Sequence, residues 1–211
     1  MVVSGPSGVG KGTLIERVCC RFPDLRKSVS ANTRPPRPDE VEGVDYCFVT
    51  KEKFREMIAA DEFYEWADVH GELKGTPKPE IRKALEGGID TVLEVDYQGA
   101  LAIKEKEPAA VLVFIAPPSW QALEGRLRGR DTESEDVIQC RLETALTELQ
   151  SIEKYDYVIV NEDADRAGEQ LAAVLTAERC RRERNASRAL VERLLAQARA
   201  ATERAERNRN I

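Results

Sequence analysis

A glycine-rich loop lies between a short apolar strand and an amphipathic helix at the start of the chain. The strand is expected at Met1-Val2-Val3, and apolar residues recur at helical spacing from Leu14 to Phe22. Glycines let successive backbone N–H groups turn toward one anion, and the helix N-terminus adds a partial positive charge. Lys11 supplies an ammonium group for the outer phosphates. We interpret the segment as a phosphate-binding loop; the alternative is an ordinary glycine-rich turn. The loop reads Gly5-Pro6-Ser7-Gly8-Val9-Gly10-Lys11-Gly12-Thr13.

Short apolar runs alternate with helical patterns along much of the remaining chain. Strands are expected at residues 91–96, 110–116 and 157–160, each followed by a helix. Ser119 is a plausible N-cap for one of these helices. Strands that alternate with helices indicate an α/β fold, in which helices cover both faces of a parallel sheet.

The segment from about residue 28 to residue 88 breaks this alternation. Residues 33–38 hold three prolines and two arginines, which excludes a helix there. Residues 46–49 and 63–69 are rich in aromatic and β-branched side chains and predict strands of a small side sheet. A helix is expected between them, around Phe54. The segment is therefore an insertion into the main sheet.

Composition excludes several classes of function. With 32 Lys and Arg against 38 Asp and Glu, the net charge of −6 gives little support to nucleic-acid binding. The longest apolar run, residues 109–118, has about half the length that a membrane helix needs, and no secretory signal is visible. Five cysteines without paired spacing favour a reducing cytoplasm. The single histidine, His70, argues against a multi-histidine metal site and a serine–histidine hydrolase.

Two carboxylates come at the end of the strand expected at residues 91–96. A period of two puts Glu94 and Asp96 on the same face. The carboxyl end of a parallel strand lies beside a phosphate loop, where a magnesium shell needs oxygen ligands. The alternative for Asp96 is an aspartate of a strand-end turn.

Several arginines form a third candidate group. Arg126, Arg128 and Arg130 flank Gly129, and Arg141 falls within the apolar stripe of the next helix. An arginine on an inward face needs an anionic partner, which the phosphates of a nucleotide could be. We favour this function for Arg130 and Arg141, and a solvated position for Arg128. The stripe consists of Val137, Ile138, Leu142, Ala145, Leu146 and Leu149.

The insertion supplies a second candidate anion site. Arg34 and Arg37 lie three residues apart in the proline-stiffened segment, and Tyr46 and Lys74 could join them. Glu65 lies among aromatic residues and needs a donor partner if it is buried. A guanine edge offers two adjacent N–H donors that match one carboxylate. Taken alone, Glu65 is more simply an exposed strand residue.

These motifs together make the chain resemble the bacterial type of guanylate kinase, from about residue 2 to residue 184. No single motif decides the resemblance, but eight occur in the same order. They are Ser28-Val29-Ser30, Thr33-Arg34-Pro35-Pro36-Arg37-Pro38, Glu42-Gly43-Val44-Asp45-Tyr46, Phe63-Tyr64-Glu65-Trp66, Asp96-Tyr97-Gln98-Gly99-Ala100, Ala116-Pro117-Pro118-Ser119, Arg126-Leu127-Arg128-Gly129-Arg130 and Val160-Asn161-Glu162-Asp163.

The resemblance implies a P-loop NTPase three-layer fold with a central parallel sheet. It implies a mixed β/α GMP-binding insertion at about residues 32–88 and a lid at about residues 127–141. Both belong to a domain of residues 1–185, and an Arg- and Ala-rich helical tail of residues 186–211 follows. The implied reaction is ATP + GMP ⇌ ADP + GDP, with dGMP as a second acceptor and magnesium as cofactor. The expected partners are nucleotides alone, without nucleic acid or membrane, and the chain is expected to be a cytoplasmic monomer or homo-oligomer.

The resemblance also assigns roles to individual residues. The catalytic residues would be Lys11, Arg130 and Arg141. ATP would be bound by Gly5, Pro6, Ser7, Gly8, Val9, Gly10, Lys11, Gly12, Thr13, Arg126, Arg130 and Asn161. GMP would be bound by Ser30, Arg34, Arg37, Tyr46, Glu65, Lys74, Gly75, Thr76, Glu94, Asp96 and Gly99. Glu94 and Asp96 could also reach magnesium through water.

Two positions depart from the usual patterns. Gly12 follows the lysine, at a position where a Ser or Thr often coordinates magnesium. The ending Lys11-Gly12-Thr13 resembles the phosphate loops of nucleoside monophosphate kinases. Lys74 stands where the family usually has a tyrosine that binds the GMP phosphate; the alternative is that Lys74 points into solvent.

Two rival functions stay open. One is a non-catalytic binding module with a guanylate-kinase-like domain, which the intact Gly10-Lys11 disfavours. The other is a kinase of a phosphorylated sugar, which would not need the base-recognition set of Ser30, Glu65 and Asp96.

Overall fold

The computed structural model describes residues 1–38, 40–69, 71–129, 135–181 and 190–200. The chain divides into two compact units, residues 1–171 and residues 172–211. Arg130, His70 and part of the expected lid lie outside the described residues.

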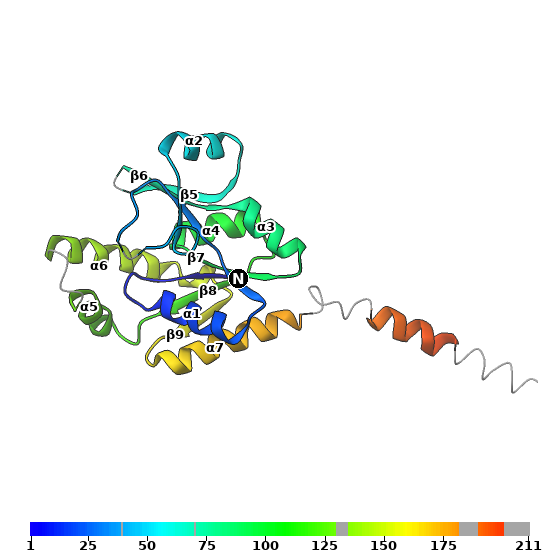
Figure 1. The fold of residues 1–211 in the computed structure, drawn as a ribbon. Coiled ribbons are helices and arrows are strands. Elements are labelled where there is room, and N and C mark those ends of the chain that lie inside the picture. Colours follow the sequence, from blue (N-terminus) through cyan, green and yellow to red (C-terminus); the bar gives the residue numbers. More distant parts are fainter. Residues whose placement is uncertain (39, 70, 130–134, 182–189, 201–211) are drawn as a thin grey trace, which may run out of the picture. The chain divides into compact units, whose positions relative to one another are not determined.

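A five-stranded parallel sheet forms the centre of the first unit (Figure 1). Its strand order is β2-β7-β1-β8-β9, with β1 in the middle. This sheet confirms the α/β fold and the strands expected near residues 91–96, 110–116 and 157–160. The strands are β1 (Val2–Ser4), β2 (Leu25–Lys27), β7 (Asp90–Glu94), β8 (Leu112–Ala116) and β9 (Tyr157–Val160).

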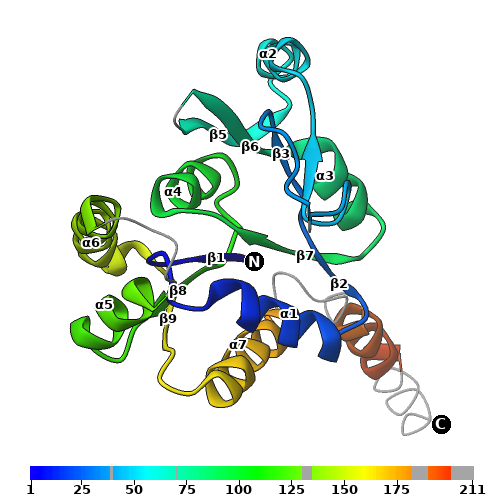
Figure 2. The ribbon, with the colours of Figure 1, turned by 60° about the vertical axis from the view of Figure 1, so that its left-hand side comes forward.

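Helices α1 (Lys11–Arg21) and α4 (Tyr97–Lys106) lie on opposite faces of this sheet (Figure 2). Alternate side chains of the strands supply the two cores, because successive residues of a strand point to opposite faces. On one face, Val2 and Leu93 cluster with Ala100 and Ile103 of α4. Helix α1 buries its own apolar side on the other face: Leu14, Ile15 and Val18.

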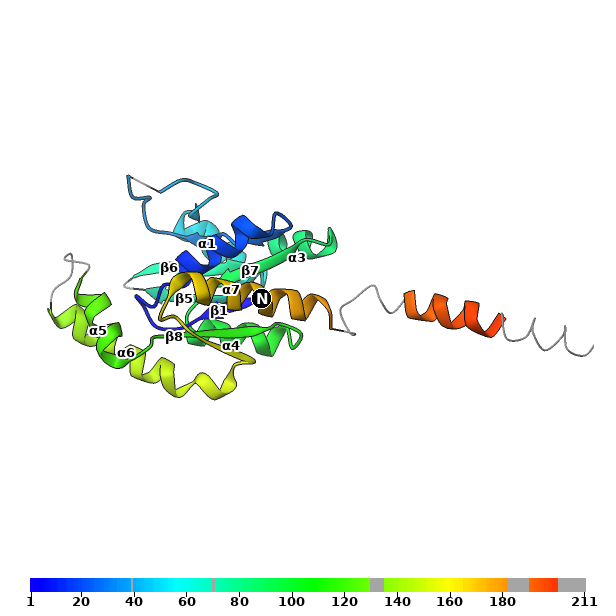
Figure 3. The same cartoon turned by 90° about the horizontal axis from the view of Figure 1, so that it is seen from below.

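Helices α5 (Trp120–Arg128) and α6 (Glu135–Gln150) lie side by side (Figures 1 and 3). Ser119 caps α5 as expected, since its Oγ accepts a hydrogen bond of 3.1 Å from Ala122 N. The stripe expected on α6 is partly wrong: Val137 and Leu146 are 42% and 54% exposed. Glu148 takes an inward position on α6 instead, since it is only 5% exposed. A short 3₁₀ helix, Ile152–Lys154, leads from α6 to β9.

The insertion forms a second, mixed sheet of four strands in the order β4-β3-β6-β5. Helix α2 (Lys51–Ala59) packs on it through Phe54, whose ring stacks on Phe63 with 4.4 Å between the ring centroids. Helix α3 (Lys78–Glu86) leads back to β7 of the main sheet. The strands are β3 (Ser30–Asn32), β4 (Tyr46–Phe48), β5 (Phe63–Val69) and β6 (Glu72–Pro77).

Helix α7 (Ala164–Arg179) begins in the first unit and ends in the second. Residues 190–200 of the second unit are also helical. The expected domain boundary at residues 185 and 186 stays a prediction. None of the helices in the described ranges combines the length and the hydropathy needed to cross a membrane.

Candidate active site

The loop between β1 and α1 has the backbone of a phosphate cradle. Gly5, Gly8 and Gly10 have φ values of 140°, 80° and 98°, which favour glycine. Gly10 is the N-cap of α1, and no side chain caps this helix. The first-turn N–H groups of α1 therefore have no side-chain cap competing with an incoming anion.

Two of these glycines are also required by close packing. A Cβ at Gly5 would lie 2.2 Å from the carbonyl oxygen of Ile115 in β8. A Cβ at Gly10 would lie 2.6 Å from Nδ2 of Asn161, which donates a hydrogen bond of 2.8 Å to the Val9 carbonyl. The loop is thus fitted against the ends of two neighbouring strands.

Arg126 supports the same loop from α5. Its guanidinium donates to the carbonyl oxygens of Asn161 and Val9, at 2.9 and 3.4 Å. Arg126 and Asn161, which are expected to bind ATP, thus lie beside the phosphate loop and donate to its Val9 carbonyl, and their contact with ATP stays a prediction.

Lys11 folds back over the loop that precedes it. Its Nζ donates to the carbonyl oxygens of Gly5 and Pro6, at 2.5 and 3.1 Å. Burial lowers the pKa of Lys11, and the charges of Glu94 and Glu148 oppose this shift. The ammonium is thus poorly solvated, which strengthens its attraction to an incoming phosphate.

Sequence reasoning missed Glu148. This carboxylate lies on α6, and burial raises its pKa while the charge of Lys11 lowers it. The available signal was its spacing, three residues after Ala145 and seven after Arg141 on one face of the helix.

The strand-end carboxylates lie beside the start of α1. A Cβ at Gly12 would be 3.7 Å from Oε2 of Glu94, which also pairs with Lys27 at 3.3 Å. Asp96 caps α4, and its Oδ1 accepts a hydrogen bond of 2.7 Å from Gly99 N.

This donor set fits magnesium bound mainly through phosphate oxygens and water. Carboxylate oxygens are the ligands that magnesium prefers in proteins, and Glu94 and Asp96 supply them beside the loop. Among the described residues, no group of three or more His, Cys, Asp and Glu side chains could hold a metal ion. The described residues therefore do not form a magnesium site made of protein ligands alone.

Arg141 reaches the phosphate loop from α6. Its Nη1 donates a hydrogen bond of 2.6 Å to Oγ of Ser7. Arg128, in contrast, is exposed and pairs with Glu124 and Glu135, as expected for a solvated side chain. Thr13 is exposed in the first turn of α1.

The insertion sheet presents polar side chains on one face. Ser30 is paired with Tyr46 across β3 and β4, and Asn32 with Lys74 across β3 and β6. Nζ of Lys74 lies 5.4 Å from the centroid of the Tyr46 ring. Lys74 therefore lies with the expected phosphate-binding residues.

Arg34 completes this cluster, but it already has a carboxylate partner. Its guanidinium lies 5.0 Å from the Tyr46 ring centroid and donates to both oxygens of Glu40, at 2.5 and 2.7 Å. The hydrogen bonds from Arg34 lower the pKa of Glu40 to about 2. Arg37 is exposed, and its backbone N–H also donates to Glu40. Sequence reasoning missed Glu40, because nothing in its spacing distinguishes it from a surface residue.

Glu65 has the donor partner that a buried carboxylate needs. Thr76 Oγ1 donates to its Oε1 at 2.5 Å, and burial raises the pKa of Glu65. Glu65, Asp96 and Gly99 line a common depression of about 240 Å³. The alternative of an exposed strand residue is therefore wrong.

Glycines permit the close approach of the strands around Glu65. A Cβ at Gly75 would lie 2.8 Å from the Glu65 carbonyl oxygen, and a Cβ at Gly99 would lie 3.2 Å from Cγ of Glu65. These two glycines thus leave room for the Glu65 side chain and its strand, and their expected contact with GMP stays a prediction.

The family model described as guanylate kinase matches residues 1–178. The chain belongs to the guanylate kinase family. It is 49% identical over 185 residues to a guanylate kinase of Caldanaerobacter subterraneus subsp. tengcongensis, covering 88% of this chain and 90% of that protein. It is 47% identical over 192 residues to a guanylate kinase of Carboxydothermus hydrogenoformans, covering 91% and 94%. The crystal structure of guanylate kinase from Anaplasma phagocytophilum matches with a TM-score of 0.72 and 35% identity, covering 90% of this chain and 92% of that one.

The close packing of Gly5 in the phosphate loop of this guanylate kinase family member predicts a loss of stability on substitution. Gly5→Ala should lower the free energy of unfolding by about 3 kcal/mol, because the new Cβ meets a backbone oxygen and φ is unfavourable. Gly43→Ala is the matched control: its φ is 75°, but a Cβ there meets nothing within 4 Å. It should cost about 1 kcal/mol. Urea denaturation measures both, and equal losses would contradict the packing argument.

Proposed function

We propose that this guanylate kinase family member transfers the terminal phosphoryl group of ATP to GMP or dGMP, with magnesium as cofactor. One observation carries the proposal: Asp96, which follows the strand that ends beside the phosphate loop, lines the same depression as Glu65 of the insertion. The charges of Asp96 and Lys74 also act on both Lys11 of the phosphate loop and Glu65. The phosphate loop and the insertion are therefore neighbours, as a reaction between two nucleotides requires.

In this proposal, ATP lies along the phosphate loop. Its phosphates would accept hydrogen bonds from the N–H groups of the loop and the first turn of α1, and from Lys11. Arg141, now bonded to Ser7, is close enough to turn to the transferring group. Arg130 completes the proposed set from the lid, and Asn161 and Arg126 keep the loop in shape.

GMP would lie against the polar face of the insertion sheet. Its phosphate would meet Arg34, Tyr46 and Lys74, with Arg37 at the rim. Its guanine edge would meet Ser30, Glu65, Thr76 and Asp96. The guanine N1–H and 2-amino groups both donate, and the Glu65 carboxylate accepts from both.

Transfer needs alignment and charge neutralisation rather than a covalent intermediate. Magnesium, bound through water near Glu94 and Asp96, would neutralise charge on the ATP phosphates when it is present. The arginines and lysines allow two anionic substrates to approach each other. Closure of the insertion and the lid would exclude water that otherwise hydrolyses ATP.

A cytoplasmic setting fits this proposal. All five cysteines are free thiols, which suits a reducing compartment.

A coupled assay of ADP formation with GMP, AMP, CMP and UMP tests the proposed function. GMP should be preferred over AMP by several orders of magnitude in kcat/KM, about 10⁴-fold, because adenine would leave the Glu65 carboxylate unpaired. Comparable rates with AMP and GMP would contradict the assignment. Phosphorylation of a sugar phosphate in preference to all four nucleotides would favour the rival kinase.

The raised pKa of Glu65 predicts a pH dependence. A carboxyl group with a raised pKa is protonated at a higher pH than an ordinary glutamate, and only the ionised form accepts from both guanine donors. The KM for GMP should therefore rise as the pH falls, beginning above the usual range of glutamate, while kcat at saturating GMP changes less.

Two variants make this pH profile decisive. Glu65→Gln should raise the KM for GMP at neutral pH and remove the acidic rise. Glu56→Gln, an exposed change on α2, should keep the profile of the unaltered chain. An acidic rise that survives in Glu65→Gln would assign it to another group.

Lys74 should contribute to GMP binding through its charge. Lys74→Ala should raise the KM for GMP about tenfold, which corresponds to the loss of one hydrogen bond to a charged group. Lys74→Tyr should keep activity but weaken the dependence of KM on salt, since tyrosine offers one neutral donor. An unchanged KM in Lys74→Ala would mean that the side chain lies outside the site.

A further inference from the structure

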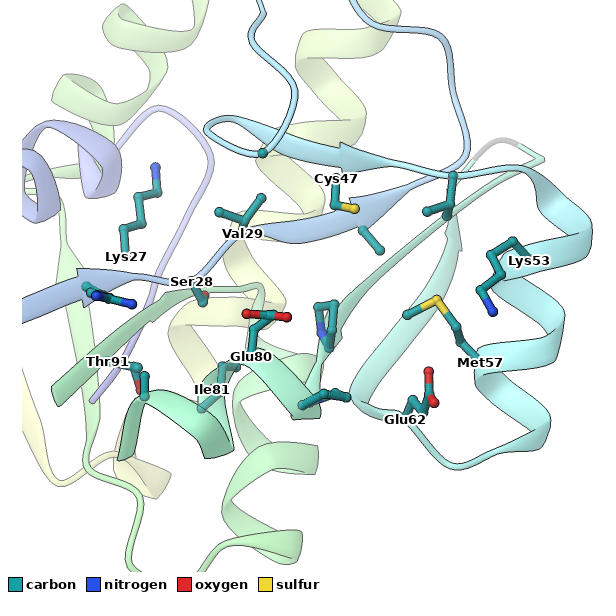
Figure 4. A pocket seen from close by; sticks show the side chains of 17 residues that line it. Lys27, Ser28, Val29, Cys47, Lys53, Met57, Glu62, Glu80, Ile81 and Thr91 are labelled. Atoms are coloured by element: carbon teal, nitrogen blue, oxygen red, sulfur yellow. The ribbon is translucent and has the colours of Figure 1, made fainter. Parts of the chain in front are cut away.

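A second cavity lies on the opposite face of the insertion sheet from the proposed GMP site. Because side chains alternate along a strand, Ser30, Tyr46 and Thr76 point to one face, while Ala31 and Cys47 point to the other. On this second face a cavity of about 740 Å³ opens between α2, α3 and the strands (Figure 4). This volume is within the range of small-molecule sites.

The cavity spans the junction between the insertion and the main sheet. Lys27 and Thr91 line it from strands β2 and β7 of the main sheet. Cys47 and Met57 line it from β4 and α2 of the insertion, and Ile81 from α3 (Figure 4). An occupant would therefore touch both parts at once.

Most of the cavity wall is apolar. The insertion contributes Val49 and Met57, α3 contributes Ile81 and Ala84, and Val29 lies in the connection between β2 and β3. An apolar molecule buried here would gain transfer free energy from water. Apolar walls do not distinguish one apolar molecule from another. Any selectivity of the cavity must therefore come from the charged side chains that line it.

The charged side chains at the cavity differ in their pairing. Lys27 pairs with Glu94, and Lys53 pairs with Glu56, both at 3.3 Å. Within the described part of the chain, the carboxylates of Glu62 and Glu80 have neither an ion pair nor a side-chain hydrogen bond. The lining thus holds two acids without such a partner, two lysines that each pair with a carboxylate outside the lining, and Arg26.

Glu80 is the acid best placed for a ligand. It lies in the first turn of α3, is exposed to solvent and lines the cavity (Figure 4). Burial raises the pKa of the Cys47 thiol, and the charges of Glu42 and Glu80 raise it further. Glu80 of α3 and Cys47 of β4 both line the cavity (Figure 4). Arg26, an exposed cation, lies at the main-sheet side.

We propose that this cavity binds a small, largely apolar molecule that carries one cationic amine, with the amine at the Glu80 carboxylate. Glu62 supplies a second negative charge, and the apolar walls take the hydrocarbon body. The site is separate from the proposed GMP site, so both can be filled together. Because the walls come from both sides of the junction, the occupant restrains movement of the insertion relative to the main sheet.

Three probes with one hydrocarbon body test the charge requirement. Calorimetric titration of the full chain with 2-naphthylmethylamine should give a Kd of about 1 mM, the scale expected for so small a ligand. 2-Naphthylmethanol should bind more weakly, and 2-naphthoate more weakly still. Equal binding of the three probes, tighter binding of the naphthoate, or no binding of the amine up to about 10 mM would overturn the proposal.

Variants then locate the site. Glu80→Gln should weaken the amine about tenfold without affecting the alcohol, while Glu86→Gln, an exposed change on the same helix, should leave both unchanged. Ala84→Leu should weaken both probes by occupying the cavity, with thermal unfolding used to verify that the variant folds. An amine affinity unaffected by Glu80→Gln and Ala84→Leu would place the probe elsewhere.

Protection of Cys47 and competition with GMP provide independent readouts. Bound amine should slow alkylation of Cys47, followed by mass spectrometry, and leave the exposed Cys140 unaffected. The amine Kd should reach a plateau as GMP is raised. A Kd that grows in proportion to GMP would put the amine in the GMP site. If GMP itself does not bind, the proposed function is wrong. Amine binding and protection of Cys47 would still show whether the amine occupies this cavity.

Discussion

The parallel pairing of β1 with β7 is the constraint on which the rest of the site depends. The register places Val3 beside Glu94, so the loop that leaves β1 and the carboxylates that end β7 come to the same edge of the sheet. Parallel strands meet at their carboxyl ends by geometry, and no long-range side-chain contact is needed to bring these groups together. Helix α1 therefore begins beside Glu94: a Cβ at Gly12 would make an ordinary van der Waals contact with this carboxylate.

The positive groups of the site have internal partners that a phosphate could replace. Lys11 donates to loop carbonyls, Arg141 to Ser7, and Arg34 to Glu40. Such contacts spare the cations the cost of burial without a partner, and they hold the side chains near the places where the proposed function needs them. Glu40 in particular would have to release or share Arg34 when a GMP phosphate arrives, so it would moderate affinity for that phosphate.

Sequence reasoning reached the parts of the fold that local patterns encode. The glycine loop, the strand at residues 157–160 and the Ser119 cap depend on neighbours a few residues away. The sequence did not predict strands β2 and β3. Each has only three residues, and each pairs with a strand that is distant in the sequence. Sequence reasoning expected an anionic partner for Arg141, and the structure places this guanidinium against the Ser7 hydroxyl of the phosphate loop, so its contact with a phosphate stays a prediction. It missed Glu148, although its spacing from Ala145 and Arg141 on one helix face was a signal. It missed Glu40 in a proline-rich loop because its partner Arg34 becomes apparent only in three dimensions.

In the proposed function, two anion sites, one on the phosphate loop and one on the insertion, act together but bind their ligands independently. The Lys11→Ala variant separates the two sites when GMP binding is followed by calorimetry and transfer is followed on the same preparation. Transfer should fall at least about a hundredfold, because a charge that stabilises the transferring group is lost, while the Kd for GMP should change less than about threefold. A GMP affinity that falls as far as turnover would contradict the division into two sites.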